Sequence, residues 1–409
     1  MKSFEVHAGW LTPPQLIGKC NIERARGKEI ISFSYDAAWL LEHPGFNPDP
    51  DIICTTGRQY PPSDKRCFGF LADTAPDRWG RMLMDRRERI DSVSENRASV
   101  TLMESDYILG VHDTGRIGGI RFFDPQNDIY LSCRDSLAAP PMEKLRELED
   151  SSYNIEDCSD KAAKKWIQNL IEPGSSLGGA RPKANVVDEN GDIWIAKFPS
   201  KSDTLDIGAW EMVAHNLALK CDIAVPEAKF LRLTKRGGTF MSKRFDRCGS
   251  KRIHYASAMT LLGQTDGNTS SVCYLDMADI IERISLNPER DLRELWKRIV
   301  FFICISNTDD HLRNHGFLLK DDSWVLSPCF DINPSTDKKT LSMAVATDDR
   351  LNFTQVLEYS NFFRVSQTEA REIISDMSEM IKKSWKQEAE RFEIPSNQQK
   401  KMAAAFAKK

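Results

Sequence analysis

The stretch Asn307-Thr308-Asp309-Asp310-His311-Leu312-Arg313-Asn314 is the most informative part of this chain of 409 residues. It is followed a few residues later by Leu326-Ser327-Pro328-Cys329-Phe330-Asp331. Together the two segments place an acid, an amide and a second acid in order, at Asp309, Asn314 and Asp331. Phosphoryl transfer from ATP uses one carboxylate to orient the attacking hydroxyl, and an Asn and a second Asp to hold magnesium ions. We therefore take Asp309 as the candidate catalytic base, and Asn314 and Asp331 as candidate magnesium ligands.

The spacing of these residues gives a second reason for the assignment. Asn314 follows Asp309 by five positions, which is the interval between the base and the metal-binding Asn in the protein-kinase catalytic loop H-R-D-x-x-x-x-N. The flanking residues differ, so the correspondence is one of chemical roles, and Asp310 adds a second charge beside the candidate base. His311 and His315 lie four positions apart but lack the Glu of a zinc-binding H-E-x-x-H motif. We expect His311 to orient the loop or to contact phosphate.

Length and composition are those of an ordinary globular protein. The chain is long enough for two or three domains. Its formal net charge of −4 and pI near 6.1 provide no broad basic field that would attract nucleic acid or an anionic membrane. The ten cysteines form no C-x-x-C pair, and the longest aliphatic and aromatic run, Ile299–Ile305, is far shorter than a membrane span. We therefore expect a cytoplasmic protein with reduced thiols and no membrane contact.

Secondary-structure patterns divide the chain into three predicted parts. Residues 1–150 read as a small α+β unit, with a strand at 29–35, a helix through 79–84 and a glycine-punctuated strand at 115–123. Residues 151–250 read as a β-rich part, with a helix at 162–171, a hairpin turning at 188–192, a helix at 206–220 and strands at 228–233 and 239–242. Residues 251–409 read as mostly helix over 255–306 and 366–409, with strands at 316–320 and 324–326. A β-rich part followed by a helical part is the order of a two-lobed kinase.

The loop at residues 175–183 is the candidate phosphate-binding element, because glycines let backbone amides approach phosphate oxygens. Gly174 and Gly179 have the spacing of a Walker P-loop, but Ala180-Arg181 stands where that motif requires Lys and Ser or Thr. A Walker NTPase is therefore disfavoured. Pro182 has no backbone N–H, so phosphate contacts are expected from the other members of the loop, namely Gly178, Gly179, Ala180 and the Lys183 side chain. A simple turn is the alternative interpretation.

Lys197 ends an apolar strand and is the candidate lysine for the nucleotide phosphates, as in the lysine strand of kinases. Its charge would be costly to bury unpaired. Glu211 in the next predicted helix is the natural partner, although Asp203 and Asp206 are also near in sequence. Between the two predicted lobes, Lys243-Arg244-Phe245 is the candidate hinge whose backbone faces an adenine. A strand that ends in a charged turn is the alternative interpretation of that segment.

These segments together resemble the HipA-type serine/threonine kinases, which are toxins of bacterial toxin–antitoxin pairs. The resemblance covers most of the chain and is most specific at residues 176–183, the Lys197 strand, 243–247, 307–314 and 327–331. A looser likeness to the family's amino-terminal signature lies at residues 68–77. The resemblance implies an α+β, bilobal protein-kinase-like (HipA-like) fold with an amino-terminal α+β subdomain and a helical carboxy-terminal lobe.

The resemblance also implies a chemistry. ATP and Mg²⁺ would be the cofactors, with Asp309 as catalytic base, Asn314 and Asp331 as metal ligands and Lys197 as a phosphate contact. Ser176 would be an autophosphorylation site. A phosphate there adds about two negative charges to the loop that would cradle ATP, so like-charge repulsion should expel the loop and silence the enzyme.

The same resemblance suggests partners. It points to a protein substrate among translation factors, such as an aminoacyl-tRNA synthetase, and to a small DNA-binding antitoxin of the HipB type. The sequence shows no helix-turn-helix signature, so contact with DNA is expected only through that antitoxin. Two other functions remain open. A small-molecule phosphotransferase shares the Asp, Asn, Asp arrangement, whereas a non-catalytic kinase-fold binding module would be expected to lack Lys197, Asp309 or Asp331, and all three are present.

Overall fold

The computed structural model describes residues 2–25, 27–133, 139–156, 170, 179–266 and 272–407. The chain separates into two compact units. The amino-terminal unit comprises Met1–Lys201 and Asp246–Ala256, and the carboxyl-terminal unit comprises Ser202–Phe245 and Ser257–Lys409. The predicted three-part division, with boundaries near 150 and 250, stays a proposal. Over the described ranges, no helix is both long enough and apolar enough to cross a membrane.

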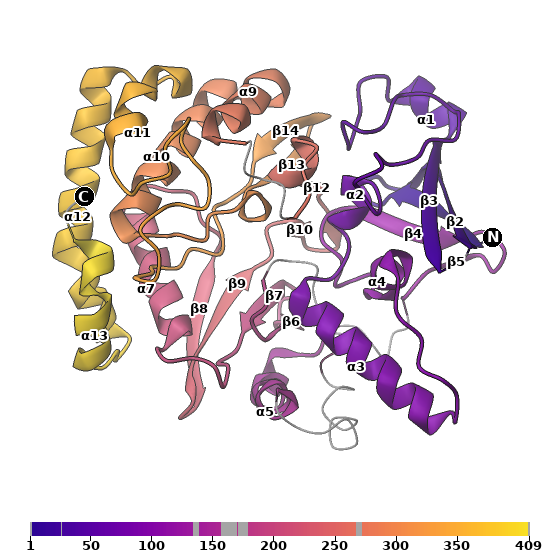
Figure 1. The fold of residues 1–409 in the computed structure, drawn as a ribbon, viewed down its shortest axis with the longest axis horizontal. Helices are drawn as coiled ribbons and strands as arrows, with labels where there is room; N and C mark the ends of the chain where they lie inside the picture. Colours follow the sequence, from indigo (N-terminus) through magenta and orange to yellow (C-terminus); the bar gives the residue numbers. More distant parts are fainter. Residues whose placement is uncertain are drawn as a thin grey trace. The chain divides into compact units, whose positions relative to one another are not determined.

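The amino-terminal unit is built on an antiparallel five-stranded sheet in the order β3-β2-β1-β4-β5 (Figure 1). Its strands are β1 Lys2–Ala8, β2 Gln15–Ala25, β3 Lys28–Tyr35, β4 Ile120–Asp124 and β5 Ile129–Tyr130. Phe4, Val6 and Ala8 alternate along β1 and are all buried, as a strand with one face on the core requires. The predicted strand at 29–35 is confirmed by β3.

The first helices of the same unit are α1 Ala37–Glu42, α2 Gly69–Ala72, α3 Arg78–Ser94 and α4 Glu104–Gly110. The start of α3 is fixed by Asp77, whose carboxylate accepts a hydrogen bond of 2.8 Å from the Gly80 backbone N–H. An acidic side chain at this position satisfies one of the unpaired N–H groups of the first turn. The helix predicted through residues 79–84 is confirmed.

The strand predicted at 115–123 is shorter than expected, because β4 begins only at Ile120. Gly118 has φ of +72°, a left-handed conformation that interrupts an extended strand. Its N–H donates to the Asp246 carboxylate at 2.7 Å, and its carbonyl accepts from the Arg247 guanidinium at 3.0 Å. The glycines at 115–119 therefore form a loop held by the segment that contains the short strands β10 Arg247–Cys248, β11 Lys251–Arg252 and β12 Tyr255–Ser257. Because β12 is a strand, the helix-rich region begins after residue 257.

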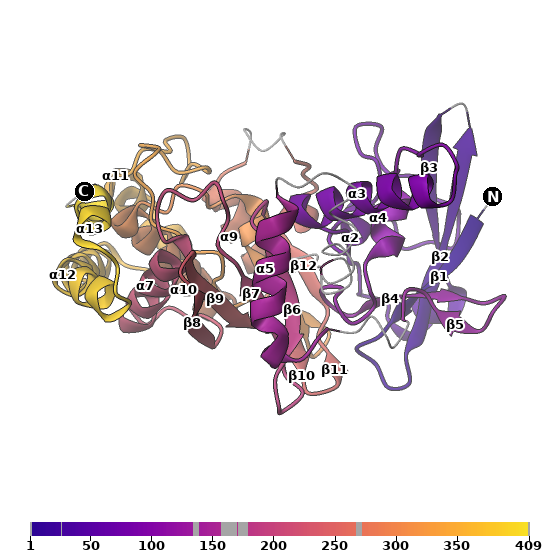
Figure 2. The ribbon, with the colours of Figure 1, turned by 90° about the horizontal axis from the view of Figure 1, so that it is seen from below.

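A β-hairpin completes the amino-terminal unit. Strands β6 Lys183–Val187 and β7 Ile193–Lys197 pair antiparallel, and the Asp188 carboxylate accepts bonds from the N–H groups of Asn190 and Asp192 within the turn. The hairpin predicted from the Asn-Gly turn is therefore confirmed. The short 3₁₀ helix η2 Met142–Lys144 and helix α5 Leu145–Ile155 precede it, and α5 lies against β6 (Figure 2). The helix predicted at 162–171 lies outside the described residues, apart from residue 170.

The carboxyl-terminal unit is mainly helical (Figure 1). Its helices are α7 Ile207–Lys220, α8 Ala258–Leu261, α9 Tyr274–Ile284, α10 Pro288–Ile305, α11 Thr354–Glu358, α12 Gln367–Arg391 and α13 Ser396–Met402. The 3₁₀ helices are η3 Leu312–Asn314, η4 Ser360–Phe363 and η5 Ala403–Phe406, and the strands are β8 Ala228–Thr234, β9 Gly237–Lys243, β13 Gly316–Lys320 and β14 Ser323–Leu326. These elements confirm the helix predicted at 206–220 and the strands predicted at 228–233, 239–242, 316–320 and 324–326.

Helix α10 is the central element of this unit. Asn287 caps it through a bond to the Arg290 N–H, and Pro288 occupies its first turn, where a missing N–H costs nothing. The residues Ile299–Ile305 are all buried, so the last two turns are surrounded by protein on every side. Helices α9 and α12 pack against α10. The end of α10 is thereby fixed, and the residues that follow it form the candidate site.

Candidate active site

The sharp turn at the end of α10 starts the candidate catalytic loop. Ser306 has φ 54° and ψ 47°, the left-handed conformation that often ends a helix. Its hydroxyl donates to the Ala405 carbonyl at 2.9 Å, and its own carbonyl accepts from the Ser335 N–H at 3.1 Å. The chain therefore leaves the helix in one direction, set by contacts to two distant segments.

The structure brings Asp309 and Asn314 together, as their spacing predicts. Asn314 is 6% exposed, and its Nδ2 donates to the Asp309 carbonyl at 2.9 Å. This bond requires the amide nitrogen, so the orientation of the side chain is determined by its acceptor. The Asn314 Oδ1 atom is consequently directed elsewhere, and it is buried without a hydrogen-bond partner among the described residues. Asp309 itself is exposed, which leaves its carboxylate accessible to a substrate.

The Asp310 side chain faces the protein interior and does not lie beside Asp309 at the surface. Its side chain is buried, accepts a short hydrogen bond from the Tyr274 hydroxyl and accepts another of 2.8 Å from the Ser342 N–H. Burial raises the pKa of Asp310 to about 6, against the lowering effect of these two bonds. The neighbouring acids therefore have different roles: Asp310 anchors the loop in the protein and Asp309 remains exposed.

Two histidines flank this loop. Burial lowers the pKa of His315 to about 3, so its ring is neutral at pH 7. The His315 ring meets the Tyr274 ring edge-on, with Nε2 3.4 Å from the Tyr274 hydroxyl. His311 contributes its carbonyl, which accepts from the Asn314 N–H at 2.8 Å, while its Nδ1 is buried without a hydrogen-bond partner in the part of the chain that is described. His311 thus holds the loop through its backbone, and a phosphate contact of its ring stays a prediction.

The segment from β14 to Asp331 is held in place by buried charged side chains of α10. The Arg298 guanidinium donates to the Ser327 carbonyl at 2.8 Å and to the Glu294 carboxylate at 2.8 Å. The Asp291 carboxylate accepts from the Leu326 N–H at 2.8 Å. Arg298 and Asp291 are each about 1% exposed. A buried charge with hydrogen-bonded partners fixes the backbone that it contacts. The position of Asp331 is therefore set from the same helix that leads to Asp309.

Asp331 is connected to the catalytic loop through two asparagines. It has φ of +58°, an uncommon conformation for a residue with a side chain. Its Oδ1 lies 3.4 Å from the Asn333 Nδ2, and the Asn333 N–H donates at 3.1 Å to Oδ1 of Asn307. Asn307 is two residues before Asp309. The two predicted metal-ligand segments are thus joined by direct hydrogen bonds within the carboxyl-terminal unit.

The candidate hinge begins where β9 ends. The Lys243 N–H donates to the Glu227 carbonyl at 2.8 Å, and the Lys243 ammonium lies 3.9 Å from the Glu227 carboxylate. Arg244 is 2% exposed. The Phe245 ring lies 5.5 Å from the ring of Phe330, the residue before Asp331. The segment that we expect to contact adenine is therefore packed against the segment that carries a candidate metal ligand.

The candidate phosphate-binding residues Gly179, Ala180, Lys183 and Lys197 belong to the amino-terminal unit. Lys183 and Lys197 are opposite each other across the β6–β7 hairpin. The Lys183 ammonium is 1% exposed and donates to the Asp77 carboxylate at 2.6 Å and to the Gly179 carbonyl at 3.4 Å. Burial raises the pKa of Asp77, and the neighbouring ammonium opposes that rise. Lys183 is thus engaged in a buried ion pair, whereas Gly179, with φ of +93°, and Ala180 are exposed.

Comparison with known proteins identifies the family. The HipA-like C-terminal domain model matches residues 175–385, just over half of the chain. The chain belongs to the HipA-like family. The predicted resemblance is therefore confirmed, and the matched region contains the lysine strand, the hinge, the catalytic loop and Asp331. No curated protein matches the sequence.

Two solved structures are similar to this chain, to different extents. HipA of Shewanella oneidensis MR-1, from the structure of the toxin–antitoxin system HipA, HipB and its operator DNA complex, is similar over 94% of this chain and 90% of its own, with a TM-score of 0.64 and 15% identity. The proinflammatory kinase CtkA of Helicobacter pylori is similar over 56% of this chain and 92% of its own, with a TM-score of 0.37 and 16% identity. The second likeness is too weak to support an inference. The first confirms the predicted α+β fold with an amino-terminal sheet region and a helical carboxy-terminal part.

Some predicted site residues of this HipA-like chain stay predictions. Gly178 and Ser176 lie outside the described residues. The proposed pair Lys197–Glu211 joins residues of different units, each described by itself. The roles of Lys183, Lys197, Gly179 and Ala180 in phosphate binding, and of Lys243, Arg244 and Phe245 in adenine binding, are likewise untested.

Sequence reasoning missed four residues that organise the site. Asn307 and Asn333 connect the two metal-ligand segments; Asn307 begins the first quoted stretch, and Asn333 lies two residues after the second. Tyr274 anchors the loop from a different helix, with no local signal. Asp77 lies in the segment that loosely resembled the family's amino-terminal signature, and its position just before a predicted helix was the available sign of a cap.

Proposed function

We propose that this chain is an ATP- and magnesium-dependent serine/threonine protein kinase. The observation that carries the proposal is the Asn314 side chain. Its nitrogen is bound to the Asp309 backbone, while its buried oxygen has no hydrogen-bond partner among the described residues. A buried polar oxygen left unpaired costs about 1–3 kcal/mol, so such an atom needs a ligand. Amide and carboxylate oxygens are what Mg²⁺ prefers.

The donor set fits magnesium, and the ligands we propose are Asn314 through Oδ1 and Asp331 through its carboxylate. Asp331 reaches the same loop through Asn333 and Asn307. One or two protein ligands are sufficient, because the remaining ligands of magnesium are phosphate oxygens and water. A magnesium ion held by these residues would supply positive charge that neutralises the phosphates.

Asp309 is the proposed catalytic base. Its carboxylate is exposed, while its carbonyl is fixed by Asn314, so the side chain is presented from a rigid backbone. It would orient the substrate hydroxyl and accept its proton as the oxygen attacks the γ-phosphorus, while the bond from that phosphorus to the β–γ bridging oxygen breaks and ADP leaves. General-base catalysis of this kind contributes roughly 10²–10⁴ in rate. Asp310 supports the same step indirectly, because its bonds to Tyr274 and Ser342 hold the loop.

The proposed nucleotide contacts are those that the resemblance to the family implies. Gly178, Gly179 and Ala180 would offer backbone N–H groups to the phosphates, and Lys197 would pair with them. Lys183 would contribute only by sharing an ammonium that already binds Asp77. The backbone of Lys243–Phe245 would contact adenine, and His311 would contact a phosphate through its buried Nδ1.

Regulation and partners are proposed on the strength of family membership. We propose that Ser176 is autophosphorylated and that its phosphate displaces the nucleotide-binding loop by like-charge repulsion. The structure of Shewanella HipA is that of a complex with HipB and operator DNA, and by analogy we propose a DNA-binding HipB-like antitoxin as partner and a growth-inhibiting role. A translation-related protein, possible examples being aminoacyl-tRNA synthetases, is the proposed substrate class.

The test is intact mass and peptide mapping after incubation with ATP and Mg²⁺. We expect one phosphate on Ser176 in the parent and at least a hundredfold slower incorporation in Asp309→Asn. Asp322→Asn is the matched control, because it makes the same change at an exposed turn between β13 and β14. It should incorporate phosphate at the parent rate.

Absence of phosphate in every sample would direct the next measurement to nucleotide binding. Calorimetric titration with a non-hydrolysable ATP analogue and Mg²⁺ would then distinguish two cases. Binding by the parent, weakened in Asn314→Ala, would mean that the kinase requires its own substrate. No binding by the parent would refute the proposed function.

A further inference from the structure

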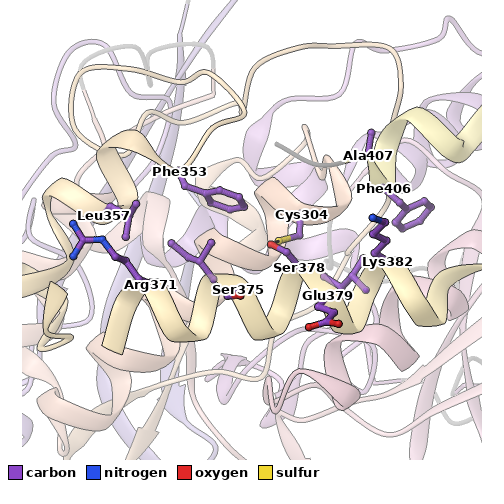
Figure 3. Close-up of a pocket in the computed structure, with 12 residues that line it drawn as sticks. Cys304, Phe353, Leu357, Arg371, Ser375, Ser378, Glu379, Lys382, Phe406 and Ala407 are labelled. Atoms are coloured by element: carbon purple, nitrogen blue, oxygen red, sulfur yellow. Dashed lines mark hydrogen bonds between the residues drawn. The ribbon is translucent and has the colours of Figure 1, made fainter. Parts of the chain in front are cut away.

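A cavity lies in the carboxyl-terminal unit, beside α12. Its volume is about 500 Å³, within the range of cavities that hold small molecules. Figure 3 shows that its walls come from α12, from α11 and the residue before it, from the end of α10 and from η5. The apolar part of the lining consists of Phe353, Leu357, Ile374, Ile381 and Phe406.

The charges at this cavity are unequal. Arg371, Lys382 and Glu379 line it, all on exposed positions of α12. Glu379 is already paired with Lys383 at 2.5 Å, and Lys382 adds to the field that lowers its pKa. Within the described ranges neither Arg371 nor Lys382 forms an ion pair with a carboxylate within 4.0 Å. Arg371 and Lys382 are eleven residues apart on α12, about 16 Å along the helix axis, and Figure 3 shows them at opposite ends of the cavity. Because Lys382 interacts electrostatically with Glu379, Arg371 is the cation of the lining that has no lining carboxylate beside it.

The walls are formed before any ligand arrives. The Phe406 ring stacks on Trp385 with centroids 4.9 Å apart and planes 9° from parallel, and Trp385 in turn lies 6.5 Å from Trp210. Across the cavity, the Cys304 thiol lies 3.6 Å from the Ser378 hydroxyl. Stacked buried rings resist collapse because they have few alternative rotamers. A ligand would therefore lose little free energy in reorganising the site.

We propose that this cavity binds an amphipathic carboxylate, with its carboxylate at Arg371 and its apolar chain running along α12 against Phe353 and Phe406. An apolar neutral molecule would form no ion pair with Arg371, and an apolar cation would be repelled by it. Ser375, one helical turn after Arg371, provides a further hydroxyl donor to the carboxylate.

The site is separate from the proposed kinase machinery but is connected to it. Cys304 lies two residues before Ser306, and Phe406 lies one residue after Ala405, whose carbonyl accepts the Ser306 hydroxyl bond at 2.9 Å. Occupation of the cavity therefore contacts the two chain segments that fix the start of the catalytic loop. The binding inference itself does not depend on kinase activity.

The test is calorimetric titration of the full chain with decanoate below its micelle concentration, beside decanol and decylammonium. We expect one decanoate per chain and much weaker binding of the other two probes. Arg371→Gln should bind decanoate about tenfold more weakly, which corresponds to about 1.4 kcal/mol. Ser375→Trp changes an exposed residue and fills the cavity, so it should abolish binding.

The matched control removes one positive charge away from the cavity. Lys400→Gln changes an exposed lysine of α13 that does not line the cavity, and it should bind decanoate as the parent does. The proposal is overturned by no decanoate binding, by equal binding of decylammonium, or by unchanged affinity in Ser375→Trp. The decanoate titration contains no nucleotide, so a negative result would not count against the proposed kinase function. Likewise, a negative phosphorylation assay would not count against decanoate binding.

Discussion

The buried ion pair between Asp77 and Lys183 provides the most direct test of the packing in the amino-terminal unit. The Asp77 Oδ2 atom lies 2.6 Å from the Lys183 Nζ atom, and the two side chains are 2% and 1% exposed. In Asp77→Asn the new amide oxygen can still cap α3 at the Gly80 N–H, as Asn is a good cap residue. The main change is therefore the loss of the charge that compensates Lys183.

The size of the effect follows from burial. Removing one partner of a buried ion pair leaves an uncompensated charge and costs about 3–5 kcal/mol. Lys183→Met leaves Asp77 as the unpaired partner, but a carboxyl group whose pKa burial already raises can become neutral by binding a proton. We therefore expect Asp77→Asn to be the more destabilising change at pH 7. In the double variant neither charge remains, so its cost should be at least about 2 kcal/mol below the sum of the single costs.

The assay is urea unfolding with pulsed hydrogen exchange, read separately on peptides from α3 and β6. This readout assigns the loss of stability to the unit that contains the pair. Asp51→Asn breaks the more exposed pair with Lys65, in which Asp51 is 17% exposed, and should cost less than half as much. Additive costs of the two single changes, within about 0.5 kcal/mol, would refute the reasoning.

Three further predictions concern the carboxyl-terminal site and the response to acid. Tyr274→Phe leaves one buried oxygen of Asp310 without its donor and should cost about 1–3 kcal/mol in urea unfolding; an unchanged midpoint would contradict the anchoring role. Burial lowers the pKa of His254 and His315 to about 3, so as pH falls below about 6.5 the unfolded chain binds protons first and stability decreases, by about 2 kcal/mol per histidine at pH 5. The raised pKa of Asp310 acts in the opposite direction between pH 6 and 4, and His254→Leu should flatten the measured pH profile. Asn314→Ala should raise the Mg²⁺ concentration for half-maximal phosphorylation about tenfold, and an unchanged requirement would exclude it as a ligand.

The local parts of the fold were predictable because their signals are local. Helix α7 begins beside Asp206, which caps it, and the β6–β7 hairpin turns at an Asn-Gly pair. The link between Asp309 and Asn314 is also local, since an interval of five residues fits one turn of the loop. Sequence pattern and spacing are sufficient to predict features whose residues lie within a few positions of one another.

Contacts between distant segments were not predictable in the same way. The sequence predicted the Lys183 side chain as a phosphate contact, but its ammonium binds Asp77, which is 106 residues away. Asp310 appeared as a repulsive neighbour of Asp309, but the partner that turns it inward belongs to α9. The strand predicted at 115–123 was too long because the conformation of Gly118 depends on a bond to Asp246. In each case the deciding partner is remote in sequence.

The bond from Ser306 to Ala405 has a practical consequence for how this protein is divided. The two residues are 99 positions apart, and the family match ends at residue 385. A fragment cut at the limits of that match would lack α13 and η5, and with them the acceptor that fixes the first residue after α10. The fragment would keep Asp309, Asn314 and Asp331 but would lose the hydrogen bond that fixes the start of their loop. Loss of the proposed kinase activity in such a fragment would therefore reflect the missing contact to Ala405 and would not argue against the proposed roles of the three residues.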